Sequence, residues 1–313
     1  ARLLSRPGEA IYNDAAGMVE GNNPFQVVWL PDAERDEWLT QVSRIAKDVA
    51  YKPETPTIVF EGNAPADMAL NPLLEEAILA PAPADLPHAP KAWLGAPNAI
   101  KGPTEIILRR QSGSNALLVG QRDEAALSLM QAAAIALSAQ FPAEGVRFVI
   151  FDGSPPDVPR RAQFERLSAS LRHPLDVIDY PDVTTEVGKL DDELQERLSS
   201  GTAGHPAIIL FVYGLQRFSK LRFEEDFGFS MGDEPAPANP SQQFDELIRE
   251  GPAAGIHTIV WSDTLNNINR TLNRRSVSEF EMRILFQMSA SDSANLIDTP
   301  QASRLGLHRA LLY

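Results

Sequence analysis

Four continuous apolar runs constrain the fold of this chain more than any other feature. The runs cover residues 116–119, 146–151, 207–212 and 256–261, and segments with a helical pattern separate them. A strand that is apolar at every position is buried on both faces, which is typical of a parallel sheet with helices on each side. The sequence therefore predicts an α/β fold with a doubly wound, mostly parallel sheet.

The stretch from Asn115 to Gln140 has the order strand, glycine turn, helix, which is where a phosphate-binding P-loop belongs. A P-loop needs glycines for close backbone approach, a lysine for the phosphates and a hydroxyl for Mg²⁺. Counted from Gly120, the Gly-Lys-Ser/Thr positions hold Ala125, Ala126 and Leu127. We therefore expect the architecture of a nucleotide site without its chemical groups. Asp123 and Glu124 add negative charge where phosphate would bind. The vestigial segment consists of Gly120, Gln121, Arg122, Asp123, Glu124, Ala125, Ala126 and Leu127.

The run 207–212 should carry the second half of such a site, an Asp for Mg²⁺ and a Glu that activates water. Tyr213 and Gly214 stand there instead, and neither can do this chemistry. Asp152 follows the run 146–151 at the edge where α/β folds bind ligands. A cap of the following turn is the favoured alternative for Asp152.

Arg270, Arg274 and Arg275 form a basic cluster after the run 256–261. The cluster is a candidate arginine finger for a neighbouring subunit's phosphate, or a contact for acidic residues of a partner. A solvated helix face is the commoner explanation.

Composition excludes several classes of function. The chain has no cysteine, and its five histidines show no ligand spacing, so we expect no metal site. A net charge of −14 over 313 residues opposes direct binding of nucleic acid, which gains affinity by neutralising phosphates. No apolar run is long enough for a membrane span, and residues 1–20 lack the apolar core of a signal peptide. These features together fit a reducing compartment, and we expect a cytoplasmic protein.

Local patterns predict the remaining elements. We expect helices at residues 32–50, 161–171, 185–199, 241–249 and 293–303, the fourth of them capped by Ser241. Helical turns broken at Pro72 are expected over residues 67–79. Strands are expected at residues 25–30, 57–60, 92–94, 105–108, 175–178, 283–288 and 309–312.

The proline-rich segment 80–90 suggests a boundary between a lead-in subdomain, residues 1–90, and a main domain, residues 91–313. A surface loop within one domain is an equally acceptable interpretation. Residues 217–240 are expected to form a long exposed loop, within which the acidic and aromatic stretch Phe223–Phe229 is a candidate protein contact. A disordered insertion is the alternative for that stretch.

Two stretches in the last third of the chain are GPAAGIHTIVWSDT and RILFQMSASDSANLIDTPQASRLGLHRALLY. The first is similar to the segment of FtsK/SpoIIIE-type motor ATPases that contains Gly-Ile-His before an apolar strand, and the second resembles the C-terminal stretch of that family. The opening of the chain resembles the entry to the FtsK-like modules of tandem multi-ATPase proteins, such as the EccC secretion motors, and the likeness covers most of residues 90–313. The matching residues in the C-terminal stretch are Arg283, Ser289, Asp292, Ser293, Ile297, Asp298, Leu305, Gly306 and Tyr313.

This resemblance implies a RecA-like fold, with other ATPase modules of the same or a neighbouring chain as partners. The sequence differs from the family pattern at the residues that carry the reaction. The P-loop and acidic-pair residues are replaced, Ala294 replaces an arginine, and Trp261-Ser262-Asp263 replaces the sensor Ala-Thr-Gln. We expect a catalytically degenerate, structural or regulatory module without a cofactor. The alternatives are a motor that couples hydrolysis of ATP with Mg²⁺ to DNA movement, and an enzyme of other chemistry near Asp152 and Gly120.

Overall fold

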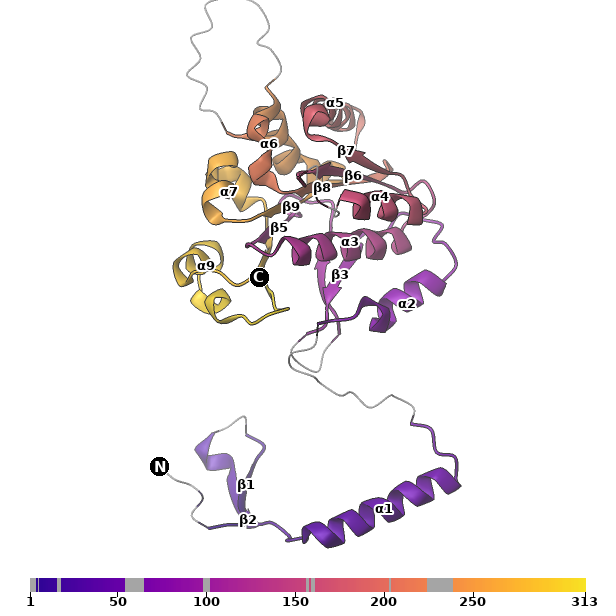
Figure 1. The fold of residues 1–313 in the computed structure, drawn as a ribbon, viewed down its shortest axis with the longest axis vertical. Helices are drawn as coiled ribbons and strands as arrows, with labels where there is room; N and C mark the ends of the chain where they lie inside the picture. The colour runs from indigo at the N-terminus through magenta and orange to yellow at the C-terminus, as the bar shows by residue number, and fades with distance from the viewer. Residues whose placement is uncertain are drawn as a thin grey trace, which may run out of the picture. The chain divides into compact units, whose positions relative to one another are not determined.

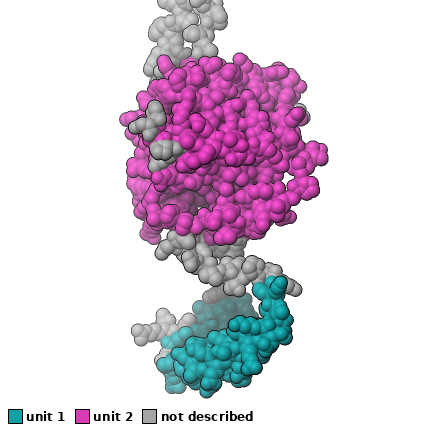
Figure 2. Space-filling view, turned by 45° about the vertical axis from the view of Figure 1, so that its right-hand side comes forward, with its two compact units in different colours: residues 1–61 teal, residues 62–313 magenta. Residues whose placement is uncertain are grey.

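The computed structural model describes residues 4, 6–15, 18–53, 65–97, 102–155, 158, 161–202, 204–223 and 239–313. The chain divides into two compact units, residues 1–61 and 62–313 (Figure 2). The division lies upstream of the proline-rich segment 80–90, which belongs to the second unit. The strand expected at residues 57–60 and most of the stretch Phe223–Phe229 lie outside the described residues.

The first unit contains a β-hairpin and one long helix. Strand β1 (Glu9–Asn13) pairs antiparallel with β2 (Asn22–Gln26), and helix α1 (Asp32–Asp48) follows. The expected strand at residues 25–30 is wrong beyond Gln26. Glu9↔Gln26 is the last pair of the hairpin, and the β-prone residues after Gln26 lie beyond the end of strand β1.

A small two-stranded sheet and a short helix precede the main sheet of the second unit. Strands β3 (Lys91–Gly95) and β4 (Thr104–Ile107) pair antiparallel, close to their expected positions. Helix α2 (Pro72–Leu79) begins at Pro72, because the Asn71 side chain caps it and proline fits the first helical position. Leu74 of α2 packs with Trp93 of β3 and Ala136 of helix α3 (Asp123–Gln140).

The core of the second unit is a seven-stranded sheet, and its topology confirms the predicted α/β class. The strand order is β11-β10-β5-β9-β8-β6-β7, and all pairings are parallel except that of β11 with β10 (Figure 1). The strands are β5 (Ala116–Val119), β6 (Val146–Asp152), β7 (Leu175–Ile178), β8 (Ala207–Tyr213), β9 (Ile256–Ser262), β10 (Met282–Leu285) and β11 (Leu311–Leu312).

Helices cover both faces of this sheet, which explains the uninterrupted apolar runs. Helices α3 and α4 (Arg161–Ser170) pack on one face in a single apolar core. Helices α5 (Val183–Ser200), α6 (Pro240–Glu250), α7 (Leu265–Thr271) and α9 (Ala290–Ile297) pack on the other face in a second core. Along β8, alternate residues enter the two cores, so every position is buried.

Several element boundaries differ from the sequence-based expectations. Asn239, rather than Ser241, caps α6, because its side chain accepts from the Ser241 N–H while Pro240 takes the first helical position. Strand β10 ends at Leu285, and α9 ends at Ile297, because the next residue, Asp298, has a φ of 56° in the left-handed region. Helices α7 and α8 (Arg274–Ser278) were not expected. Among the described residues, no helix is long and apolar enough to span a membrane.

Candidate functional site

The predicted nucleotide site lies at the turn between β5 and α3. Only Gly120, Gln121 and Arg122 separate the strand from the helix, which begins at Asp123. The positions that should hold Gly-Lys-Ser/Thr therefore lie within the first turns of α3, where Ala126 and Leu127 are buried in the core. A phosphate-cradling loop of the P-loop length has no room between this strand and this helix.

Trp261 and Tyr213 occupy the space beside this turn. The Trp261 indole N–H donates to the Gly120 C=O at 3.0 Å, and the Tyr213 hydroxyl donates to the Asp123 C=O at 3.1 Å. Their ring centroids are 4.7 Å apart, and Trp261 and Tyr213 are only 5% and 3% exposed. Phe164 of α4 packs edge-on against Tyr213 at 5.5 Å. An aromatic pair from β8 and β9 thus closes the turn.

Gly120 allows this close packing. Its φ of +135° is one that L side chains rarely adopt, and a Cβ there would lie 2.8 Å from the Phe286 Cβ. The Gly120 N–H donates to the Ser262 C=O at 3.1 Å, which ties the turn to β9. The glycine is therefore explained by packing against Phe286, without any phosphate.

Acidic groups lie where a P-loop presents its N–H groups. Asp123 and Glu124 are in the first turn of α3, a position that the helix dipole favours for negative charge. The Asp123 carboxylate accepts from the Glu124 N–H at 2.9 Å. The N-terminus of α3 thus carries protein carboxylates, which repel a phosphate anion.

The carboxyl end of β8 carries Tyr213 and Gly214. Tyr213 faces α3, and Gly214 turns the chain in the left-handed region with a φ of +84°. Asp152, in register with Tyr213 on the neighbouring strand β6, is 3% exposed and accepts from the Ser154 N–H at 2.8 Å. This contact is that of a turn cap, the favoured interpretation.

Arg270, Arg274 and Arg275 are exposed at the end of α7 and in α8. Sequence reasoning missed a second group beside them. The Phe223 N–H donates to the Thr271 C=O at 3.0 Å, which brings the segment before Phe223 against α7. We name the six exposed cations of these segments the basic surface, and none of them forms an ion pair in the described part of the chain: Arg217, Lys220, Arg222, Arg270, Arg274 and Arg275.

Residues of the C-terminal stretch act as structural braces. The Arg283 guanidinium donates to the carbonyls of Val277, Phe280 and Leu296. The buried Ser293 hydroxyl donates to the Thr299 C=O and accepts from the Ala302 N–H. These hydrogen bonds stabilise the fold of residues 277–302.

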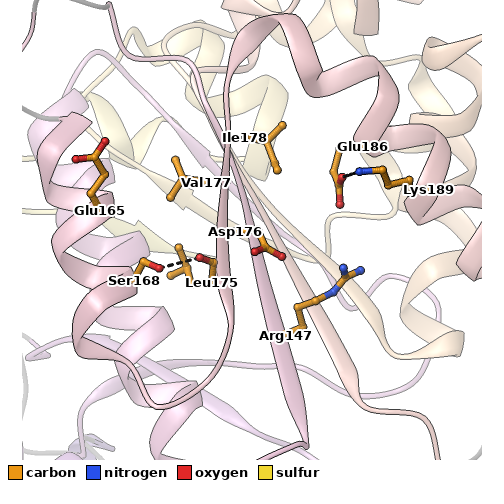
Figure 3. Close-up of a pocket in the computed structure, with 9 residues that line it drawn as sticks. All are labelled: Arg147, Glu165, Ser168, Leu175, Asp176, Val177, Ile178, Glu186 and Lys189. Carbon is orange, nitrogen blue, oxygen red and sulfur yellow. Dashed lines mark hydrogen bonds and ion pairs between the residues drawn. The ribbon is translucent and has the colours of Figure 1, made fainter.

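The described residues contain no group of three or more His, Cys, Asp or Glu side chains placed to hold a metal ion. The buried His257 donates from Nδ1 to the Ser114 C=O, and burial lowers its pKa to about 4, so it is neutral. A cavity of about 640 Å³ lies away from the turn, along β7 (Figure 3).

Solved structures share this fold. The pCW3 conjugation coupling protein TcpA, in its monomer form with ATPγS, has a TM-score of 0.52 at 12% identity over 88% of this chain and 78% of its own. The cytoplasmic domain of EssC has a TM-score of 0.50 at 13% identity over 87% of this chain and 49% of its own. The cytoplasmic domain of the Thermomonospora curvata type VII secretion ATPase EccC has a TM-score of 0.49 at 16% identity over 75% of this chain and 28% of its own.

The chain therefore spans half or less of the EssC and EccC structures. No protein-family profile matches the chain, and no curated protein matches it by sequence. At these identities the likeness establishes the fold, which is the RecA-like α/β fold of FtsK/SpoIIIE-type ATPase domains.

Proposed function

We propose that this chain is a structural or regulatory FtsK/SpoIIIE-like module that does not hydrolyse ATP. The aromatic closure of the β5–α3 turn carries the proposal: Trp261 and Tyr213 bond the two carbonyls, of Gly120 and Asp123, that flank the position of a phosphate. We infer that these two side chains hold the turn closed, so that it does not open into the longer loop that a phosphate needs.

The missing chemistry supports the same conclusion. Phosphoryl transfer depends on positioning and on charge stabilisation by a lysine and a metal ion, with a further group that orients the attacking water. Ala126 lies at the lysine position, and Tyr213-Gly214 at the position of the acidic pair. With both parts absent, the proposed module has neither the cations that stabilise the transition state nor a base for water.

Its proposed partners are other ATPase modules, in the same or a neighbouring chain. This chain spans only 49% of the EssC cytoplasmic domain, so a structure of that kind has room for further modules. The basic surface is the proposed contact, because its six cations form no ion pair with the residues that the structure describes, and in a chain of net charge −14 they favour an acidic neighbour or its nucleotide phosphate. Arg270, Arg274 and Arg275 stay the candidate arginine fingers.

Calorimetric titration of the full chain with Mg·ATP and Mg·ADP tests the proposal. We expect no binding heat at millimolar nucleotide and no phosphate release. Phosphate release would contradict the proposal. Micromolar binding without phosphate release would show a rebuilt pocket, and the alanine variants of Gln121, Arg122 and Arg275 would then locate it.

DNA binding separates the proposal from the alternative, a DNA-translocating motor. We expect no change in the fluorescence anisotropy of a labelled duplex at 50 mM salt, because the overall negative charge opposes phosphate contacts. Binding that weakens steeply with added salt, together with ATP turnover, would favour the motor.

A further inference from the structure

The cavity along β7 has the geometry of a slot for one more strand. Strand β7 ends the order of the seven-stranded sheet, and β6 is its one strand neighbour among the described residues. Figure 3 shows Glu165 and Ser168 of α4 on one side of β7, and Glu186 and Lys189 of α5 on the other. We name this cavity the β7 groove. It follows the open edge of the sheet between two helices.

The backbone of β7 presents hydrogen-bonding groups to this groove. The Phe148 N–H donates to the Pro174 C=O at 2.9 Å, so Pro174 faces β6. Because backbone groups alternate along a strand, Asp176 also faces β6, whereas Leu175 and Val177 face the open edge. The Ser168 hydroxyl already donates to the Leu175 C=O at 2.8 Å. The N–H groups of Leu175 and Val177 and the Val177 C=O are directed to an incoming strand.

The side chains of β7 also alternate between the two walls. Leu175 and Val177 are paired with Phe148 and Ile150 and belong to the α4 side. Asp176 and Ile178 therefore lie on the α5 side. Val177 and Ile178 are only half-buried, so each wall offers apolar surface beside the edge. An added strand would place alternate side chains against α4 and α5 in the same way.

The charges that line the β7 groove determine which kind of strand it can bind. Both cations that line it are neutralised: Arg147 pairs with Glu193 at 3.1 Å, and Lys189 pairs with Glu186 at 2.8 Å. Glu165 and Asp176 are exposed and form no ion pair with the described residues. One of these carboxylates lies on each side of the edge. The groove is therefore complementary to a strand that carries a cation on each face.

We propose that the β7 groove binds an extended, basic segment of a partner protein by strand addition. The segment carries Lys or Arg residues three positions apart, since an odd spacing places them on opposite faces of a strand, with β-branched residues between them. A second copy of this chain fits poorly, because it would bring the same carboxylates into the groove. This inference is independent of the function proposed for the β5–α3 turn.

Titration of the isotope-labelled full chain with synthetic hexapeptides tests the inference by NMR. The probe is Thr-Lys-Val-Val-Lys-Thr with blocked ends, and the matched peptide has Glu at both Lys positions. We expect amide shifts centred on Leu175 and Val177 with the basic peptide, and at least about tenfold weaker binding of the acidic peptide. No shift at millimolar basic peptide, or equal binding of the two peptides, overturns the proposal.

Two variants test separately the backbone edge of β7 and the two carboxylates of the groove. Val177→Pro removes an N–H that faces the open edge, so the sheet retains its ladder while peptide binding is lost. Glu165→Lys with Asp176→Lys should weaken the basic peptide about tenfold. The control pair Glu75→Lys and Glu76→Lys, on exposed positions of α2, makes the same change in net charge and should leave the affinity unchanged.

Two further outcomes would exclude strand addition or a separate partner protein. Unchanged binding by Val177→Pro, with its fold verified by the amide spectrum, would exclude strand addition. A dimer in sedimentation velocity that Val177→Pro dissociates would assign the groove to a second copy and overturn the partner proposed here.

Discussion

Trp261 contributes to stability through its packing and through a single hydrogen bond. Trp261→Phe keeps a ring against Tyr213 but leaves the Gly120 C=O without its 3.0 Å donor. We predict a loss of about 1–3 kcal/mol in the free energy of unfolding, because an unpaired buried carbonyl is costly. Urea denaturation measures it. Trp38→Phe, at a tryptophan that is 58% exposed, is the control and should change stability by less than about 0.5 kcal/mol.

His257 should make stability depend on pH. Burial lowers its folded pKa to about 4, below its ordinary value of 6.5, so the neutral form is the folded one. Its contribution is fully present above pH 6.5 and is lost as the pH falls towards 4, amounting to about 3 kcal/mol over that window. His257→Asn retains a donor for the Ser114 C=O and cannot titrate. We predict a flatter stability curve for this variant between pH 6.5 and 4, and parallel curves would contradict the assignment.

At the scale of elements, Gly120 joins β5 to α3 under a steric constraint. We predict that Gly120→Ala destabilises the chain by about 2 kcal/mol or more, since the new Cβ meets Phe286 and the φ is strained. Gly188→Ala is the matched control within α5, where an added Cβ would meet nothing within 4 Å. That change should stabilise the chain by about 0.5–1 kcal/mol. Equal thermal shifts of the two variants would refute the argument.

Some elements of the fold could be predicted from the sequence, and others could not. The apolar runs at β5, β6, β8 and β9 predicted the sheet, because burial on both faces leaves a continuous local signal. The loss of the expected residues at Tyr213 and Trp261 was visible as well. Their bonds to the β5–α3 turn were not, since they join residues 90 and 141 positions apart. The sequence pattern did not predict short helices such as α8, because they depend on a side-chain cap, which is Asn273 in α8.

At the scale of the whole molecule, the apolar cores formed by the described residues belong to the second unit. We predict that the truncated chain 65–313 folds by itself, since it contains the complete sheet and the helices on both of its faces. Cooperative thermal unfolding and a dispersed amide spectrum would verify this. A chain that aggregates or melts without a transition would show that the core needs residues 1–64.

The aromatic closure of the β5–α3 turn affects how the stability of this module responds to the concentration of nucleotide in the cell. A protein whose folded state binds a nucleotide gains stability with nucleotide concentration, by RT ln(1 + [L]/Kd). Here Trp261 and Tyr213 stabilise the turn from within the chain. Under the proposed function, the abundance and shape of this module do not vary with the ATP-to-ADP ratio. In an assembly with working motors, it would be the one component with the same conformation in a starved cell and in a growing one.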